Sequence, residues 1–573
     1  MTRCEMSLGP YLSAVQTALR EIGAGNVIEK IWELDHTVWK KEPHEIADRL
    51  GWLRSPFKMR QRISELKTFT DEVRSAGYTQ ALLLGMGGSS LASDVMRQAF
   101  GVKEGFLDLS ILDSTDPAAV ASHAERIDLS KCLFIVSSKS GTTAEVLSFF
   151  KYFYNLTSQA LGADKTGEHF IAITDPGNTL NDLAAKCRFR KVFPGDMTIG
   201  GRFSALSVFG LLPGALMGID ITTLLGRAIS MAEVCEQKDA SWSGTNLGLK
   251  LGATLGSLAR VGRDKLTFFI SEKAACFGDW AEQLIAESTG KEGKGILPVV
   301  GEKPGDPNVY GQDRVFVSMS LPGDASYQSI ISRLADAGHP VIRVFLQDLY
   351  DLGEQFFLWE FATAVAGHVV SINPFDQPNV ESSKILTKSA VDEYRKTGRL
   401  SAQYPVLTEK NVSVFAPSKA FNLKEALEGF LAKAGEGSYV SLQAYINRTQ
   451  RTDESLNELR LLLRDKLRLP TTLGYGPRFL HSTGQLHKGD AGKGLFIQIT
   501  ADDAKDLTIP DEAGSSNTSM TFGVLKAAQA LGDGAALKAA SRNVIRLHLT
   551  GNDIPSAINT ITDALRKPSH GTL

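Results

Sequence analysis

Short apolar runs alternate with longer amphipathic segments along most of the chain. Runs such as Gln80–Leu84, Cys132–Val136 and Phe170–Thr174 are rich in large aliphatic and aromatic residues, which is typical of strands buried on both faces. Between them, segments such as Leu91–Phe100 place apolar residues three and four positions apart, which indicates helices with one buried face. This alternation predicts parallel sheets covered by helices on both sides.

The same pattern divides the chain into four parts. Residues 1–76 predict an N-terminal helical arm. Residues 77–224 and 225–400 each predict an α/β domain, and the element order of the second is similar to that of the first. Residues 401–573 predict a further C-terminal α/β block.

Three segments carry more detailed predictions. The arm is expected to contain a helix over Val27–Lys40. In the C-terminal block, the stretch 471–492 is expected to be irregular, and separate helices are expected over 522–531 and 534–543.

Composition narrows the class of protein. The 573 residues carry a formal net charge of -2, which gives no reason to expect nucleic acid or a membrane surface as a partner. The five cysteines are scattered without a CxxC pair, which favours a reducing compartment over a disulfide framework. The chain opens without a signal-peptide pattern, and its apolar runs are too short to span a bilayer. A cytoplasmic protein is therefore expected.

The stretch Lys131–Phe153 has the features of a phosphate site. A buried strand is followed by the turn Ser137–Thr143, which is rich in hydroxyl groups and contains Lys139, and then by an amphipathic helix. The first N–H groups of a helix are unpaired and carry partial positive charge, so hydroxyls and a lysine beside them can bind a small phosphate ester. An ordinary helix capped by serine or threonine is the alternative.

A glycine-rich turn, GMGGSS at 85–90, lies between an earlier strand and its helix. It resembles a dinucleotide fingerprint, and Asp113 ends the next strand at a spacing that would suit a ribose. However, Ser90 replaces the third glycine of the pattern, which argues against nicotinamide binding. The absence of a Walker lysine after the glycines argues against a nucleotide P-loop.

Two further stretches carry candidate chemistry. Gln283 and Glu287 are four residues apart near the end of a predicted helix, so they share one face, and a carboxylate at this end meets an unfavourable helix dipole that suits a base. A solvated glutamate is the alternative. His481 and His487 lie among glycines and hydroxyl-bearing residues, without the further ligands or the HExxH pattern of a metal site, so no metal is expected.

Six segments together resemble the glucose-6-phosphate isomerase family, which is built from two sugar-isomerase (SIS) α/β domains. They cover most of the chain after residue 80: GMGGSSLASDV (85–95), SSKSGTTAEV (137–146), GGRFSALSVFGLLP (200–213), EQLIAESTGK (282–291), NPFDQPNVESSK (373–384) and FLHSTGQLHKGD (479–490). The last segment is out of order, because in the ordinary family the histidine segment precedes the FDQ segment. This order is similar to that of the isomerase half of bifunctional transaldolase/glucose-6-phosphate isomerases.

The resemblance implies a fold of two SIS-type doubly wound parallel-sheet domains, to which the arm and the C-terminal block are added. It also implies that glucose 6-phosphate and fructose 6-phosphate are interconverted through a cis-enediol without metal or cofactor. Glu287 would move the proton, Arg202 would stabilise the enediolate, and His481 with Lys384 would assist ring opening. The substrate-binding residues that it implies are Gly87, Gly88, Ser89, Ser138, Lys139, Ser140, Thr143, Gln283 and Gln377.

Three other functions compete with this interpretation. A non-catalytic SIS-type regulator would keep the two turns but would need neither Glu287 nor His481. A glucosamine 6-phosphate-forming amidotransferase would carry a cysteine directly after Met1, where this chain has Thr2. The third alternative is an isomerase that accepts both glucose 6-phosphate and mannose 6-phosphate, since these two sugars differ only at C2. A hexose 6-phosphate is the expected partner, and a homodimer is one assembly that the resemblance allows.

Overall fold

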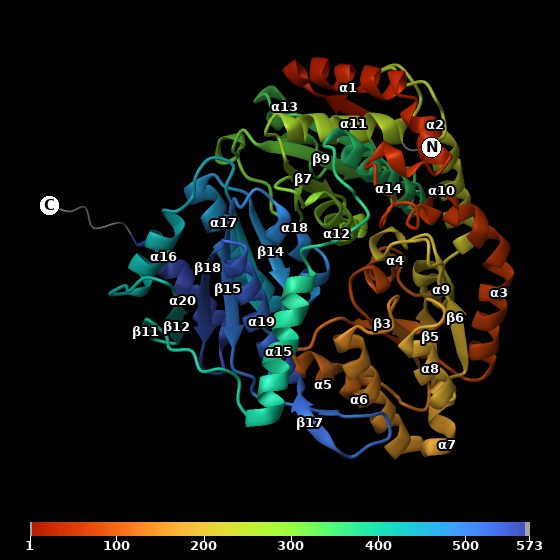
Figure 1. Ribbon diagram of the computed structural model, residues 1–573, viewed down its shortest axis with the longest axis vertical. Coiled ribbons are helices and arrows are strands. Elements are labelled where there is room, and N and C mark those ends of the chain that lie inside the picture. Colours follow the sequence, from red (N-terminus) through yellow and green to blue (C-terminus); the bar gives the residue numbers. More distant parts are fainter. Residues whose placement is uncertain (1–2, 568–573) are drawn as a thin grey trace.

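The computed structural model describes residues 3–567 and contains three main sheets. In Figure 1 the first sheet domain lies at the lower right, the second at the top, and the C-terminal block, in blue, at the left. This arrangement confirms the predicted fold class of parallel-sheet α/β domains with a C-terminal α/β block.

The first sheet is entirely parallel, with strand order β3-β2-β4-β5-β6. Its central strand β4 is buried along its whole length, as the apolar run predicts. The strands are β2 (Gln80–Gly85), β3 (Asp108–Leu112), β4 (Cys132–Ser137), β5 (Phe170–Thr174) and β6 (Lys191–Pro194). The helices of this domain are α4 (Leu91–Phe100), α5 (Pro117–Arg126), α6 (Ala144–Leu161), α7 (Ala163–Thr166), α8 (Thr179–Lys186) and α9 (Val208–Leu216).

The second sheet has the order β1-β10-β9-β7-β8. Its parallel strands are β7 (Lys265–Ile270), β8 (Leu297–Val299), β9 (Arg314–Ser320) and β10 (Val341–Phe345). Its helices are α10 (Ile221–Cys235), α11 (Leu247–Arg260), α12 (Phe277–Thr289), α13 (Gln328–Asp336) and α14 (Leu352–Val369). Helices α11 and α14 pack together in its apolar core, where both are buried over most of their length.

The N-terminal arm is mostly helical, with α1 (Leu12–Ala24), α2 (Val27–Trp32) and α3 (Ser55–Ser75). Two details differ from the predictions. The arm begins with strand β1 (Arg3–Ser7), which pairs antiparallel with β10 and so belongs to the second sheet. Helix α2 ends at Trp32 and does not reach Lys40, because Leu34 takes a left-handed φ of 63° and the Asp35 side chain accepts a hydrogen bond from Thr37 N.

The C-terminal block contains a mixed sheet of order β11-β12-β18-β15-β13-β14. The strands are β11 (Leu407–Glu409), β12 (Val412–Phe415), β13 (Tyr439–Tyr445), β14 (Thr471–Tyr475), β15 (Gly494–Ala501) and β18 (Asn543–Leu549), and β16 (Thr508–Pro510) with β17 (Thr518–Thr521) forms a separate hairpin. The helices are α15 (Glu381–Thr397), α16 (Leu423–Leu431), α17 (Gln450–Leu467), α18 (Gly484–Gly489), α19 (Phe522–Ala539) and α20 (Ile554–Arg566).

Two predictions about this block are wrong. The stretch 471–492 contains strand β14 and helix α18, and one continuous helix, α19, replaces the two that were expected. Glycines within α19 serve close packing and do not end the helix: a Cβ on Gly532 would lie 2.5 Å from Thr387 Oγ1 of α15, and one on Gly534 would lie 2.8 Å from Gln498 Oε1 of β15. Small residues at these points let α19 approach its neighbours.

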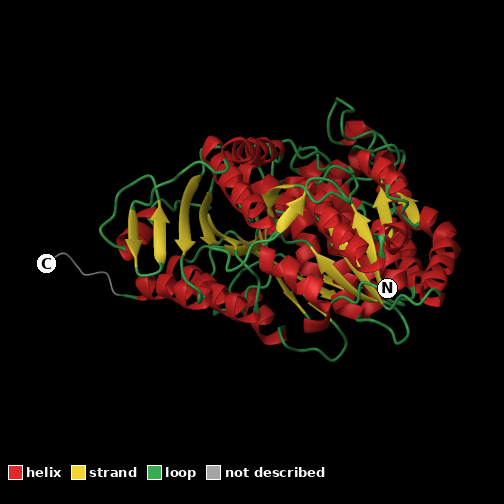
Figure 2. Cartoon of the chain, turned by 90° about the horizontal axis from the view of Figure 1, so that it is seen from below, coloured by secondary structure: helices red, strands yellow, loops and turns green. Residues whose placement is uncertain are grey.

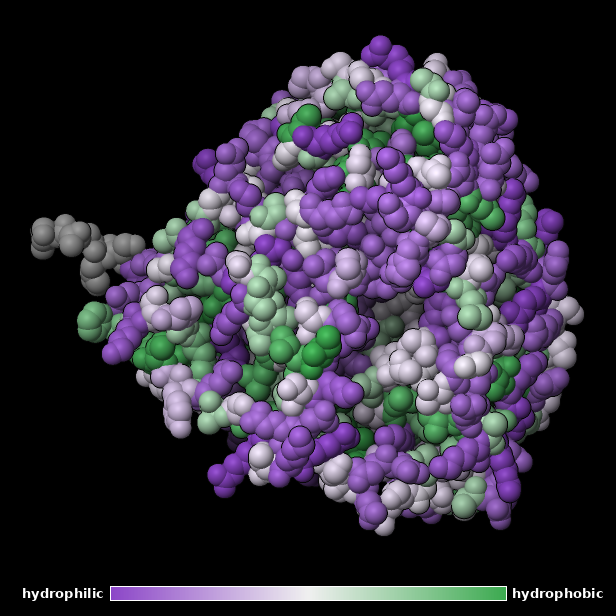
Figure 3. All heavy atoms as spheres, viewed as in Figure 1, coloured by the Kyte–Doolittle hydropathy of each residue, from purple (hydrophilic) through white to green (hydrophobic). Residues whose placement is uncertain are grey.

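Helix α15, in cyan in Figure 1, runs along the junction between the C-terminal block and the first sheet domain. In Figure 2, which shows the molecule from below, the strands of the C-terminal sheet lie at one end, apart from the strands of the other two domains. The surface in Figure 3 is largely hydrophilic and is hollowed near its centre, between the positions of α15 and α4 in Figure 1. Within residues 3–567, no helix is long and apolar enough to cross a membrane.

Candidate active site

The two polar turns of the first domain lie side by side at the carboxyl edge of its sheet. Strands β2 and β4 are hydrogen-bonded neighbours, and Gly85 at the end of β2 is in register with Ser137 at the end of β4. The Ser137 hydroxyl donates to the Ser89 carbonyl at 2.8 Å, which ties one turn to the other. Ligands of open α/β sheets bind at this edge, so the position suits the predicted phosphate site.

The hydroxyl groups of the second turn are arranged around the start of α6. Ser138 Oγ lies 3.1 Å from Thr143 Oγ1 and accepts from Gly141 N at 3.2 Å, whereas Ser140 is exposed. Gly141 has a φ of 70°, and a Cβ at this position would lie 2.4 Å from Asn178 Oδ1. A residue with a side chain would therefore be strained and would displace Asn178, so the turn requires glycine.

Lys139 is held away from these hydroxyls. Its Nζ forms an ion pair with Asp175 and donates to the Asp196 carbonyl at 2.9 Å. Burial lowers the pKa of Lys139, and the Asp175 carboxylate acts in the opposite direction. The structure therefore places Lys139 beside the turn, with its charge already paired.

The glycines of the first turn allow two other segments to approach. Gly87 has a φ of 53°, and a Cβ there would lie 2.8 Å from the His481 carbonyl oxygen. A Cβ on Gly88 would lie 2.1 Å from the Gly201 carbonyl oxygen, next to Arg202. These glycines therefore bring the segments of His481 and Arg202 against the phosphate turns.

Glu287 lies near the C-terminal end of α12, as the sequence predicts, and its two oxygens have different partners. Oε1 is 3.3 Å from Arg202 Nη1, and Oε2 accepts from Gln283 Nε2 at 3.0 Å. The same Gln283 amide donates to the His481 carbonyl at 2.7 Å. One side chain thus connects the segments that carry the candidate base and the candidate histidine.

Arg202 is fixed by a dense set of contacts. Its side chain is 2% exposed, Nε donates to Ser288 Oγ at 2.8 Å and Nη1 donates to Gln377 Oε1 at 2.9 Å. Nη2 donates to the carbonyls of Pro374 and Asp376 at 2.7 and 2.9 Å. The guanidinium is therefore held rigidly beside Glu287, and Gln377 is placed against it.

Lys291, at the end of the ESTGK segment, is a charged group that the sequence analysis did not single out. Its side chain is 1% exposed, and Nζ contacts Asp376 Oδ1 at 2.7 Å. Burial, together with the charge of Arg202, lowers the pKa of Lys291 to about 8. Lys291 and Arg202 both bind the segment around Asp376, so they fix the loop that carries Gln377.

His481 lies at the end of a short turn, Arg478–His481, that follows β14. Its Nε2 is 2.9 Å from Glu145 Oε1, and this oxygen also accepts from Gln529 Nε2 at 2.7 Å. Burial opposes protonation of His481, but the carboxylate of Glu145 outweighs it, so the pKa of the imidazole is raised. Because Nε2 faces Glu145, Nδ1 is the ring nitrogen that this contact leaves free.

Glu145 and Gln529 were missed by the sequence analysis. Glu145 sits in the first turn of α6, four residues before the buried Phe149 and next to the buried Val146. An acidic residue at a position expected to be buried is the one signal in the sequence that could have identified it. Gln529 comes from α19, and nothing in its local pattern connects it with the first domain.

Lys384 lies on α15 and faces a different environment. Its side chain is 61% exposed, and Nζ is 3.4 Å from Glu381 of the same helix. Lys384 and His481 both line a cavity of about 490 Å³, together with Ser140, Thr143 and Glu145. The structure therefore brings Lys384 to the rim of the site, without a contact to Glu287.

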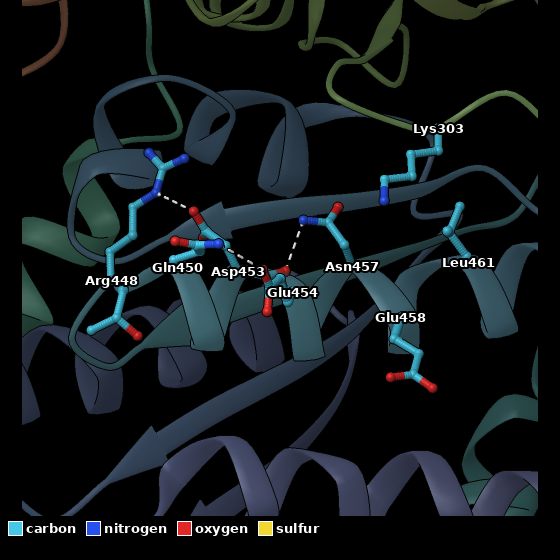
Figure 4. Close-up of a pocket in the computed structure, with 9 residues that line it drawn as sticks. Lys303, Arg448, Gln450, Asp453, Glu454, Asn457, Glu458 and Leu461 are labelled. Carbon is cyan, nitrogen blue, oxygen red and sulfur yellow. Dashed lines mark hydrogen bonds and ion pairs between the residues drawn. The ribbon is translucent and has the colours of Figure 1, made fainter.

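A larger depression, of about 790 Å³, lies along the first turns of α17. Figure 4 shows two pairs among its polar side chains: Arg448 contacts Asp453, and Gln450 contacts Glu454. None of the predicted site residues lines it. Within residues 3–567, no group of three or more histidine, cysteine, aspartate and glutamate side chains is placed to hold a metal ion.

Comparison with known proteins agrees with this geometry. Residues 56–237 match the model of the phosphoglucose isomerase family. The chain is 30% identical to a probable glucose-6-phosphate isomerase from Haloquadratum walsbyi over 342 residues, which cover 78% of that protein and 53% of this chain. This chain belongs to the glucose-6-phosphate isomerase family.

Other relatives extend the likeness. A glucose-6-phosphate isomerase from Rubrobacter xylanophilus is 26% identical over 402 residues, which cover 90% of that protein and 62% of this chain. A crystal structure of a glucose-6-phosphate isomerase from Chlamydia trachomatis superposes with a TM-score of 0.57 at 20% identity, and the match covers 86% of that chain and 66% of this one. That structural likeness concerns the fold alone. In each comparison, about a third or more of this chain lies outside the match.

Proposed function

We propose that this chain is an aldose–ketose isomerase that interconverts glucose 6-phosphate and fructose 6-phosphate by proton transfer between C1 and C2. The observation that carries the proposal is that Gln283 contacts both Glu287 and the backbone of His481, beside the buried Arg202. This contact supports a single site in which a base, a charge stabiliser and a proton donor for the ring act together, next to the phosphate turns.

Glu287 acts as the base in this proposal. Its carboxylate removes the proton from the carbon next to the carbonyl, which leaves a cis-enediol intermediate. The carboxylate then returns the proton to the neighbouring carbon. The charge that develops on the oxygen atoms is met by Arg202, which its contacts hold in place before the reaction. Such preorganised charge is a large contribution to catalysis because nothing has to reorient during the step.

His481 opens the sugar ring. Its pKa is raised, so the imidazolium can donate a proton to the ring oxygen near neutral pH and later accept one back. Glu145 holds the imidazole and stabilises its positive charge, and Gln529 orients Glu145. Lys384, at the rim of the same cavity, assists at the anomeric hydroxyl.

The phosphate group anchors the far end of the substrate. Ser89, Ser138, Ser140 and Thr143 supply hydroxyls at the carboxyl edge of the first sheet, and the N-terminus of α6 supplies unpaired N–H groups. Binding energy from the phosphate, at the opposite end of the sugar from C1 and C2, is thereby used to hold these two carbons in the correct position. The sugar-orienting roles belong to Gln283 and Gln377, each of which already contacts a catalytic group.

A coupled assay tests the activity. The purified chain is supplied with fructose 6-phosphate, glucose 6-phosphate or mannose 6-phosphate in the presence of a chelator. We expect turnover between the first two sugars. Turnover of mannose 6-phosphate would add the dual specificity, and binding of these sugars without turnover would instead support a regulator.

A substitution tests the base. We expect Glu287→Gln to lower kcat by at least about a thousandfold, on the order of 4 kcal/mol, with little change in KM. The matched control is Glu292→Gln, five residues further on, where the side chain is 46% exposed and pairs with Lys40. Near-normal turnover of Glu287→Gln would remove Glu287 from the role of base.

A further inference from the structure

The C-terminal sheet has a cavity of its own at the carboxyl edge of its parallel strands. The cavity has a volume of about 250 Å³, and residues from the ends of β13, β15 and β18 line it together with residues of α19. None of the residues assigned above to the hexose phosphate site lines this cavity. In Figure 1 the elements β15, β18 and α19, which contribute lining residues, lie next to one another in the blue block.

The topology of the sheet favours a ligand at this place. From β13 the chain crosses through α17 to β14 on one side, and from β15 it crosses through α19 to β18 on the other. Helix α17 packs on the face of Leu442 and Ala444, whereas α19 packs on the face of Tyr445. Adjacent strands whose connections leave in opposite directions form a switch point, which is where open α/β sheets bind ligands.

Arg546, on β18, is the charged residue that gives this cavity its chemistry. Its guanidinium stacks on the Phe415 ring at 4.0 Å, and Nε is buried without a hydrogen-bond partner. No carboxylate within residues 3–567 forms an ion pair with it. By contrast, the buried Arg202 and Arg314 each contact a glutamate. A partly desolvated arginine without a counter-charge is unfavourable in the protein alone and is suited to an anionic ligand.

The electrostatics agree with the contacts. Burial lowers the pKa of Arg546, and no charged neighbour adds to or opposes that effect. Lys526, the other cation of the wall, is already neutralised by Asp503 and by Asp116 at 2.7 Å. Two carboxylates on one ammonium leave this cluster negative, so the attraction for an anion comes from Arg546 and not from Lys526.

Tyr445 lines the cavity without offering it a donor. Its side chain is 1% exposed, and its hydroxyl is buried without a hydrogen-bond partner in the described part of the chain. A hydroxyl with almost no accessible surface lies behind the cavity wall, so Tyr445 contributes to the shape of the cavity and Arg546 supplies its N–H donors.

We propose that this cavity is a second ligand site, which binds a small metabolite through a phosphate or carboxylate group held by Arg546. The planar fork of arginine matches both oxyanions in a two-pronged arrangement. The volume of about 250 Å³ is below the roughly 300–1,000 Å³ of pockets for drug-sized ligands, so the ligand is small. The site is independent of the proposed isomerase activity.

Calorimetric titration of the full chain tests the proposal, with inorganic phosphate and malonate as the two probes. Phosphate is expected to bind at two places per chain, the phosphate turns and the cavity. Arg546→Met should weaken one of these binding events at least tenfold and leave the other unchanged. Arg566→Met is the matched control, since Arg566 is 52% exposed on α20 and is expected to leave both events unchanged. Binding of malonate would extend the site to carboxylates, and its absence would restrict it to phosphates.

Thermal unfolding provides a second readout that does not depend on heat of binding. Arg546→Met should raise the Tm of the protein without ligand, because it removes an unpaired cation, and should reduce the stabilisation by the probes. A wild-type chain that shows one phosphate event and no malonate event would overturn the proposal. Two events that persist with wild-type affinities in Arg546→Met would also overturn it.

Discussion

The contact between Glu145 and His481 can be tested by a substitution that keeps the shape of the side chain and removes its charge. In Glu145→Gln, the oxygen that lies 2.9 Å from His481 Nε2 belongs to a neutral amide. Burial then acts on the imidazole with only the weaker effect of the Glu287 carboxylate against it, so the pKa of His481 is expected to fall. A charge-assisted hydrogen bond is worth about 1.5–3 kcal/mol, which corresponds to a loss of roughly ten- to 150-fold in the ring-opening step.

The assay compares two substrates. Fructose 6-phosphate must be opened from its cyclic form, whereas 5-deoxyfructose 6-phosphate has no free hydroxyl on C5 or C6 to close a ring and keeps the six-carbon spacing between the phosphate and C1. We expect Glu145→Gln to lower kcat on the cyclic substrate by roughly ten- to 150-fold and to change the open-chain rate by less than about threefold. His481→Ala should show the same selectivity with a larger loss. The pH at which activity on the cyclic sugar falls should also move to a lower value in Glu145→Gln.

The control for charge is Glu125→Gln, on the surface of the same domain, where Glu125 is exposed. It should leave both rates and the pH profile unchanged. Equal losses on the two substrates in Glu145→Gln would show that Glu145 supports the whole site and has no special part in ring opening. An unchanged pH profile would mean that the Glu145 carboxylate does not set the protonation of His481.

Three further predictions follow from other parts of the molecule. Gly141→Ala should raise the KM for fructose 6-phosphate at least about tenfold, because a left-handed φ costs a non-glycine residue roughly 1–2 kcal/mol and the new Cβ would meet Asn178; an unchanged KM would contradict the role of this turn. Burial raises the pKa of the Glu282 carboxyl to about 8. The contribution of this group to the free energy of unfolding is therefore fully present below about pH 4.5 and is lost as the pH rises through 8. Urea unfolding should show that Glu282→Gln removes this loss, which is worth at least about 1 kcal/mol. Since His481 and Glu287 come from one chain, specific activity should stay constant on dilution to concentrations at which sedimentation shows only monomers, and a fall in specific activity would mean that a second chain is needed.

Much of the fold could be predicted because its strands are buried on both faces. Strands such as β4 appear in the sequence as continuous apolar runs, and the polar turns that follow them mark the carboxyl edge of the sheet. Strand β1 could not be predicted in this way, since RCEMS has no strong pattern and is fixed only by pairing with β10, more than three hundred residues away. The glycines of α19 likewise look like a helix end until the approach of α15 and β15 is known.

The candidate site was predictable where its residues stand in local motifs. Glu287, Arg202 and His481 each lie in a segment whose spacing or resemblance indicates a role, and the structure places their segments next to one another. The partners of these residues were not predictable. Glu145 and His481 are 336 positions apart, and Gln529 reaches Glu145 from a third segment, so no local pattern connects them. The ion pair of Lys139 with Asp175 was also not evident, because it depends on how β5 lies beside β4.

The position of His481 in the last third of the chain has a consequence for synthesis and quality control. A ribosome completes the phosphate turns and Glu287 well before it reaches the strand that leads to His481. An incomplete or clipped product would lack His481 and would also leave uncovered the apolar face of the first domain that packs against Ile509, Phe522 and Leu525. Such a product exposes core surface and is a target for chaperones and proteases, so the C-terminal block completes the first domain as well as the candidate site.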